Sequence, residues 1–265
     1  SWKRTNMASD DNTINIVTAA FVIIGNEILS GRTKDANLSF LASELSNIGI
    51  RLEEVRIIKD DHVIIAETVR IIRKQYDYVF TSGGIGPTHD DITCDSIAQS
   101  FNLEVYHHPD AVQRMSDHAR KRDVELNEAR MRMARTPKGA TLILNPISAA
   151  PGFTVENVHV MAGVPSVFQA MVKELLPTLK TGTKVHSVTV ICNLGEGLIA
   201  KGLEEIQIQK PNIDIGSYPY FRSGVYGTEL VLRGTDIKDI EASAESIRQL
   251  IIKNGGHPTN EKDYK

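Results

Sequence analysis

The sequence is poor in cysteine and has no long apolar segment. Its two cysteines, Cys94 and Cys192, lie far apart and form neither a CxxC pair nor a disulfide framework. Such scarcity is typical of a reducing compartment, so we expect a cytoplasmic protein. No run of 18 apolar residues occurs, so no membrane span is predicted. Residues 1–15 lack the apolar core of a secretory signal and predict a disordered tail.

The sequence also lacks a surplus of positive charge. It has 30 Lys and Arg against 33 Asp and Glu, a net charge of −3. A general nucleic-acid binder usually has a basic surplus, so we expect no nucleic-acid partner. Basic residues are concentrated only between residues 114 and 135, where we interpret them as a solvated helix face with Glu128 pairing to Arg132. These residues are Arg114, Arg120, Lys121, Arg122, Arg130, Arg132 and Arg135.

Hydrophobic residues make up 41% of the chain, enough for a substantial core, and their spacing predicts alternating strands and helices. That alternation over residues 16–178 is typical of a mainly parallel sheet between two layers of helices, a three-layer α/β/α domain. The predicted strands are residues 16–24, 51–58, 78–81, 105–107, 141–144, 154–156 and 158–161. The predicted helices are residues 35–48, 62–75, 93–101, 109–135 and 166–175.

The pattern changes after Pro177. Residues 183–256 predict a small α+β lobe, either a separate domain or an extension of the first. Residues 257–265 are polar and predict a tail. The lobe has predicted strands at residues 185–191, 214–218 and 229–234 and predicted helices at residues 196–206 and 237–254.

A glycine-rich loop, Ser82-Gly83-Gly84-Ile85-Gly86-Pro87, joins a predicted strand to a predicted helix. Glycine lets a ligand approach the main chain, and successive N–H groups can form an anion nest beside the start of the helix. The loop lacks the lysine of a Walker A motif and the spacing of GxGxxG. Taken alone, it is equally compatible with a tight turn that binds nothing.

Two adjacent acids, Asp90 and Asp91, follow this loop. Capping of the next helix would explain one of them. Beside a phosphate, however, two carboxylates repel the ligand unless a divalent cation lies between, and Mg²⁺ is typically held by one or two carboxylates plus substrate phosphates. Ser82, Thr88 and Thr93 add hydroxyl groups. The loop with its acids therefore predicts a phosphate site.

The segment GGIGPTHDDIT resembles the signature of the molybdopterin-binding domain family, which includes MoaB, MogA and the N-terminal part of CinA. The stretch 145–149 departs from the family, which often has Gly-Thr before Ala-Pro-Gly. Several further segments are similar in the same order, which makes the resemblance far more specific than one motif. They are Gly25–Gly31, Asp35-Ala36-Asn37, Lys59-Asp60-Asp61, Asn127-Glu128-Ala129, Ala150-Pro151-Gly152-Phe153, Gly163-Val164-Pro165, Gly195-Glu196 and Gly227-Thr228-Glu229.

The resemblance implies a MogA-like fold and a small-molecule ligand, molybdopterin or an adenine nucleotide. For the CinA branch and the related domain of FAD synthase it also implies hydrolysis of a dinucleotide pyrophosphate such as ADP-ribose with Mg²⁺, Mn²⁺ or Co²⁺. The alternative is a non-catalytic molybdopterin- or nucleotide-binding protein linked to molybdenum cofactor biosynthesis. Related proteins are often dimers or trimers, so we expect a homo-oligomer.

The site residues expected on this basis fall into three groups. The catalytic acids are Asp60, Asp90 and Asp91, and the metal ligands are Glu27, Asp60, Asp90 and Asp91. The ligand- or phosphate-binding residues are Asn37, Ser82, Gly83, Gly84, Gly86, Pro87, Thr88, Thr93, Gly163 and Pro165.

Overall fold

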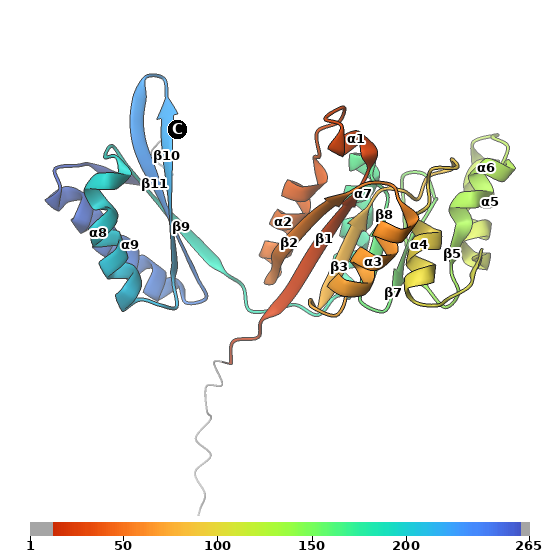
Figure 1. Cartoon of the computed structure of the whole chain (residues 1–265), viewed down its shortest axis with the longest axis horizontal. Helices are drawn as coiled ribbons and strands as arrows, with labels where there is room; N and C mark the ends of the chain where they lie inside the picture. The colour runs from red at the N-terminus through yellow and green to blue at the C-terminus, as the bar shows by residue number, and fades with distance from the viewer. Residues whose placement is uncertain (1–12, 261–265) are drawn as a thin grey trace, which may run out of the picture. The chain divides into compact units, whose positions relative to one another are not determined.

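The structure is a computed structural model and describes residues 13–260. Residues 15–182 form one compact unit, and residues 183–260 belong to a second unit (Figure 1). Most of the predicted N-terminal tail and the last five residues lie outside the described residues. In the part of the chain that is described, no helix is long and apolar enough to cross a membrane.

The first unit is built around a six-stranded sheet in the order β2-β1-β3-β8-β7-β6. Neighbours among the first four strands of this order run parallel, while β7 is antiparallel to both β8 and β6. The prediction of a mainly parallel sheet is therefore confirmed. The strands are β1 (Val17–Ile24), β2 (Ile50–Ile58), β3 (Tyr78–Ser82), β6 (Thr141–Ile143), β7 (Gly152–Val155) and β8 (Val158–Met161).

Helices cover both faces of this sheet (Figure 1). Successive strand residues point to opposite faces, so Phe21 and Ile23 pack against α2 and α7, whereas Val22 and Ile24 pack against α3 and α4. Each fully buried side chain of this size contributes about 1.5–3 kcal/mol to folding. The result is the predicted three-layer arrangement. The helices are α2 (Asn37–Asn47), α3 (His62–Ile72), α4 (Thr93–Ser100) and α7 (Pro165–Leu175), which continues into η2 (Leu176–Thr178).

The prediction of one long helix over residues 109–135 is wrong. The helix α5 (Pro109–Lys121) ends before Asp123, which has a left-handed backbone with φ of 51°. Asn127 then caps a new short helix by accepting a hydrogen bond from the Arg130 N–H at 2.9 Å. The break turns the chain back toward the sheet through α6 (Glu128–Met131), η1 (Arg132–Ala134) and β5 (Arg135–Pro137), which pairs with β4 (Val105–His107). One more short helix, α1 (Asn26–Leu29), follows β1.

The second unit is a four-stranded sheet in the order β10-β11-β9-β12, with helices α8 and α9 packed on a shared apolar core. The predicted tail from residue 257 is wrong in part, because Pro258–Asn260 pairs with β9 as a short edge strand. So short a polar segment has no apolar pattern, and only its neighbour shows it to be a strand. The elements are β9 (His186–Cys192), α8 (Glu196–Gln209), β10 (Asp214–Arg222), β11 (Val225–Gly234), α9 (Ile237–Lys253) and β12 (Pro258–Asn260).

Candidate functional site

The turns that follow β1, β3 and β8 meet at the carboxyl edge of the parallel strands. Gly83 has φ of +94°, and a Cβ there would lie 2.1 Å from the carbonyl oxygen of Ile24. A Cβ on Gly163 would lie 3.2 Å from the Cα of Gly83. The three turns are thus packed backbone against backbone, and a side chain on Gly83 does not fit. In open α/β sheets, ligands bind at this edge.

The glycine loop presents unpaired backbone donors. The Gly83 N–H donates to the Met161 carbonyl at 3.1 Å. In contrast, the N–H groups of Gly84, Ile85 and Gly86 have no acceptor within the described chain. Thr93 holds the loop from the helix side, because its hydroxyl donates to the Gly83 carbonyl and its N–H to the Gly84 carbonyl, both at 3.0 Å. Three successive free donors are what an anion nest requires.

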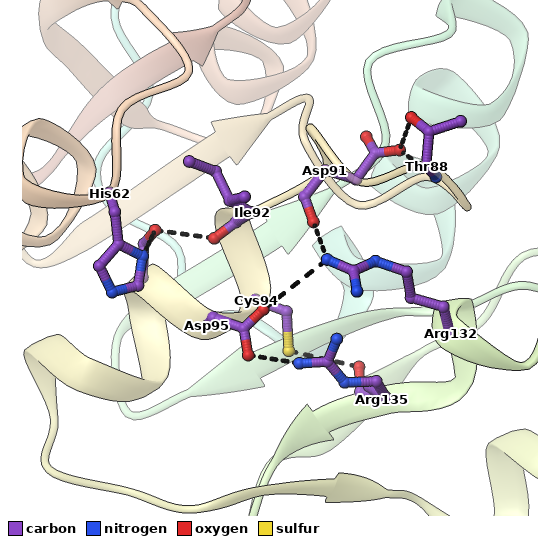
Figure 2. Close-up of polar contacts among 9 residues, drawn as sticks. His62, Thr88, Asp91, Ile92, Cys94, Asp95, Arg132 and Arg135 are labelled. Atoms are coloured by element: carbon purple, nitrogen blue, oxygen red, sulfur yellow. Dashed lines mark hydrogen bonds and ion pairs between the residues drawn. The ribbon is translucent and has the colours of Figure 1, made fainter. Parts of the chain in front are cut away.

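The three loop residues line a narrow crevice of about 10 Å³, close to the space for one water molecule. Arg132 is one of the residues that line this crevice. Its Nη2 donates to the backbone carbonyl of Asp91 at 3.0 Å and lies 4.0 Å from an Asp95 carboxylate oxygen (Figure 2). Arg135 forms a short ion pair with the other oxygen of Asp95. The residues that line the crevice are Gly84, Ile85, Gly86, Asp91, Cys94, Arg132, Met133, Arg135, Pro151 and Phe153.

The interpretation of Arg132 and Arg135 as part of a solvated helix face is therefore wrong. Their side chains are only 31% and 19% exposed, and Arg132 contacts Asp91 and Asp95 rather than the expected Glu128. Both lie beyond the break in the predicted helix, where the chain returns to the sheet. A signal was present at Asn127, because an Asn followed by an acid in the first turn, here Glu128, is typical of a new helix start.

The acids after the loop close a turn. One carboxylate oxygen of Asp91 accepts both the N–H and the hydroxyl of Thr88 at 2.9 Å. The same hydroxyl makes a short hydrogen bond to Asp90, and this bond holds the pKa of the Asp90 carboxyl below its usual range. Neither acid caps α4, whose N-cap residue is Ile92. The capping explanation is thus wrong.

The other two predicted acids lie on neighbouring turns. Asp60 accepts the Asn26 N–H at 3.0 Å, and the Asn26 side-chain oxygen accepts the Asp60 N–H at 3.2 Å, which ties the turn after β2 to the turn after β1. The cap of α3 is Asp61 and not Asp60. Glu27 is exposed, with its carboxylate folded over Gly25. Among residues 13–260, no three His, Cys, Asp or Glu side chains are grouped closely enough to hold a metal ion.

Asn37 and Gly163 were both predicted as residues of one site, and they are in contact although 126 residues separate them. The Asn37 amide donates to the Gly163 carbonyl at 2.9 Å, and its own oxygen is buried with no hydrogen-bond partner among the described residues. Pro165 begins α7 immediately beyond this contact.

The side chains of Ser82 and Thr93 are buried, whereas Pro87 and Thr88 are exposed at the tip of the loop. Their role as ligand-binding residues stays a prediction.

A larger hollow of about 620 Å³ lies near the amino ends of β3 and β8. It is bordered by His159, whose burial lowers the pKa of the imidazole to about 4. One ring nitrogen bonds the Thr154 hydroxyl at 2.8 Å and the other has no partner within the described residues. A neutral imidazole offers one hydrogen bond and no charge, whereas the loop residues with free N–H groups line one crevice together with Arg132.

A mainly parallel α/β sheet with a glycine-rich loop and adjacent acids at its carboxyl edge is a MogA-like fold. Residues 20–181 match the family described as a probable molybdopterin binding domain, and the chain belongs to this family. Residues 184–255 match the middle domain of FAD synthase.

Relatives and solved structures agree with this assignment. A protein of Archaeoglobus fulgidus is 35% identical over 75% of this chain and 85% of its own length. A probable FAD synthase of Caenorhabditis elegans is 30% identical over 88% of this chain, which spans only 50% of that protein. The crystal structure of CinA, of unknown function, from Thermoplasma acidophilum is 29% identical with a TM-score of 0.56, covering 61% of this chain and 98% of that one.

Proposed function

We propose that the glycine loop binds a phosphate of an adenine nucleotide or a pterin, and that the protein hydrolyses a dinucleotide pyrophosphate such as ADP-ribose. The observation that carries the proposal is the row of unpaired N–H groups at Gly84, Ile85 and Gly86. Hydrogen bonds from neutral donors to an ionised phosphate are about twice as strong as bonds between neutral groups. The family and the match to the FAD synthase middle domain support a nucleotide-type ligand.

For hydrolysis, Asp90 or Asp91 would accept a proton from a water molecule. The water oxygen then bonds to one phosphorus, the bridging P–O bond breaks, and the leaving phosphate takes the electron pair and a proton. With ADP-ribose the products are AMP and ribose 5-phosphate. A divalent cation would have to be held jointly by these acids or Asp60 and the substrate's own phosphates, where it would polarise the phosphoryl oxygens.

A specific observation favours the alternative, a protein that binds the ligand without cleaving it. Thr88 engages the carboxylates of both Asp90 and Asp91, so each acid already has a structural role in closing the loop. In that case binding would survive removal of divalent cations by a chelator, and substitution of Asp91 would alter affinity alone.

The test compares Asp91→Asn with Asp123→Asn, an exposed acid whose left-handed backbone an asparagine tolerates. The assay is ADP-ribose turnover with Mg²⁺, Mn²⁺ or Co²⁺, alongside calorimetric binding. If Asp91 is the base, Asp91→Asn lowers kcat by about 100-fold or more and leaves binding largely intact, while Asp123→Asn changes neither. Binding without turnover by the unmodified protein supports the alternative, and the absence of both contradicts the whole proposal.

A further inference from the structure

Arg132 has unused hydrogen-bonding capacity inside the crevice. A guanidinium has five N–H donors, and Arg132 makes one hydrogen bond, to the Asp91 carbonyl at 3.0 Å. Its separation of 4.0 Å from Asp95 is too long for a second. The side chain is 31% exposed, so its remaining donors can reach a ligand from the open side of the crevice.

Arg135 does not share this freedom. It is bound tightly by Asp95 and is only 19% exposed (Figure 2). The Asp91 carboxylate accepts hydrogen bonds from Thr88, and the shorter contact to Asp95 belongs to Arg135. Among the described residues, Arg132 therefore has no carboxylate within hydrogen-bonding distance, and it lines the same crevice as Gly84, Ile85 and Gly86.

The present partner of Arg132 is a neutral carbonyl. A phosphate oxygen is ionised, and bidentate contacts between arginine and phosphate are among the strongest hydrogen bonds in proteins. Because the crevice has room for about one water molecule, we expect a phosphate to take the place of the Asp91 carbonyl as the acceptor from Arg132. The exchange replaces a weak acceptor by a strong one, so it favours the bound state.

We propose that Arg132 binds the second phosphate of a diphosphate ligand whose first phosphate lies on the N–H groups of the glycine loop. The inference rests on the proposed function and adds which residue makes the site prefer a diphosphate to a monophosphate. Arg132 is thus a specificity-determining residue.

The experiment measures the affinities of ADP and AMP by calorimetry for the unmodified protein, Arg132→Gln, Arg132→Lys and the control Arg130→Gln. Arg130 is exposed and lies two residues away. We expect Arg132→Gln to weaken ADP binding by about tenfold or more, the effect of losing hydrogen bonds to a charged group, and to change AMP binding little. Arg132→Lys keeps the charge but has fewer donors, so its ADP affinity should lie between those of the unmodified protein and Arg132→Gln. The affinities of Arg130→Gln should match those of the unmodified protein.

Two results for Arg132→Gln overturn the inference. One is a loss of AMP affinity equal to or greater than the loss of ADP affinity, since Arg132 would then act on the whole loop. The other is an unchanged affinity for ADP. Melting temperatures show whether Arg132→Gln folds. If it does not, the ratio of ADP to AMP affinity in Arg132→Lys decides, and an unchanged ratio overturns the inference. If the unmodified protein binds neither nucleotide, the proposed function fails as well, whereas ADP binding that is insensitive to Arg132 refutes only the role of this residue.

Discussion

Replacing Gly83 by alanine perturbs the closest backbone contact of the site. Gly83 has φ of +94°, and the new Cβ would lie 2.1 Å from the Ile24 carbonyl oxygen. A carbonyl at the end of a central strand cannot move aside as a flexible side chain can. The substitution therefore strains the backbone of the loop and forces the turns after β1 and β3 apart.

The magnitude follows from two contributions to the free energy of unfolding. A left-handed backbone costs alanine about 1–2 kcal/mol. Overpacking against rigid neighbours costs about 1–3 kcal/mol more. Gly31 is the matched control, because its φ is +76° and no heavy atom lies within 4 Å of the Cβ position. We expect a loss of about 2–5 kcal/mol for Gly83→Ala and only the backbone contribution of about 1–2 kcal/mol for Gly31→Ala.

The assay must report on the unit formed by residues 15–182, because two units can unfold separately. Hydrogen exchange of peptides from β1 and β3, measured as a function of urea, gives that unit's own stability. In thermal unfolding, each kcal/mol corresponds to about 2–4 °C for a unit of this size. Equal destabilisation by the two alanines would refute the reasoning, since it would mean that the contact with Ile24 carries no energy.

Two further predictions concern buried polar side chains. Burial lowers the pKa of His159 from 6.5 to about 4, so the unfolded chain binds a proton that the folded chain does not, and stability falls as the pH drops through this range. The free energy of unfolding, measured with urea, should fall by about 2 kcal/mol between pH 7 and pH 5. His159→Phe should reduce this fall, and an identical pH dependence in both proteins would contradict the reasoning. Asn37→Ala removes the bond to the Gly163 carbonyl and should cost about 1–3 kcal/mol in the same assay. The exposed Asn47→Ala on the same helix should cost little, and equal effects would show that the Gly163 contact is not stabilising.

The main strands of the sheet and the glycine loop were predictable because their signals are local. A parallel strand buried on both faces needs a continuous apolar run such as the one that ends at Gly25. The left-handed backbone at Gly83 and Gly84 needs glycine, and the free N–H groups follow from it. The paired acids were also located correctly beside this loop, although their contacts with Thr88 were not foreseen.

Contacts between distant segments were not predictable from one sequence. The amide of Asn37 meets Gly163 across 126 residues, and Arg132 meets the Asp91 carbonyl across 41. Both contacts depend on how the helices fold back onto the sheet. Because the helix ends at Lys121, Arg132 lies on the wall of a crevice and not on a solvated helix face. The sequence by itself determined the sheet and its glycine-rich loop, because backbone conformation and burial are encoded residue by residue. Only the tertiary structure decided which charge faces that loop, because a side chain's partners depend on where the rest of the chain returns.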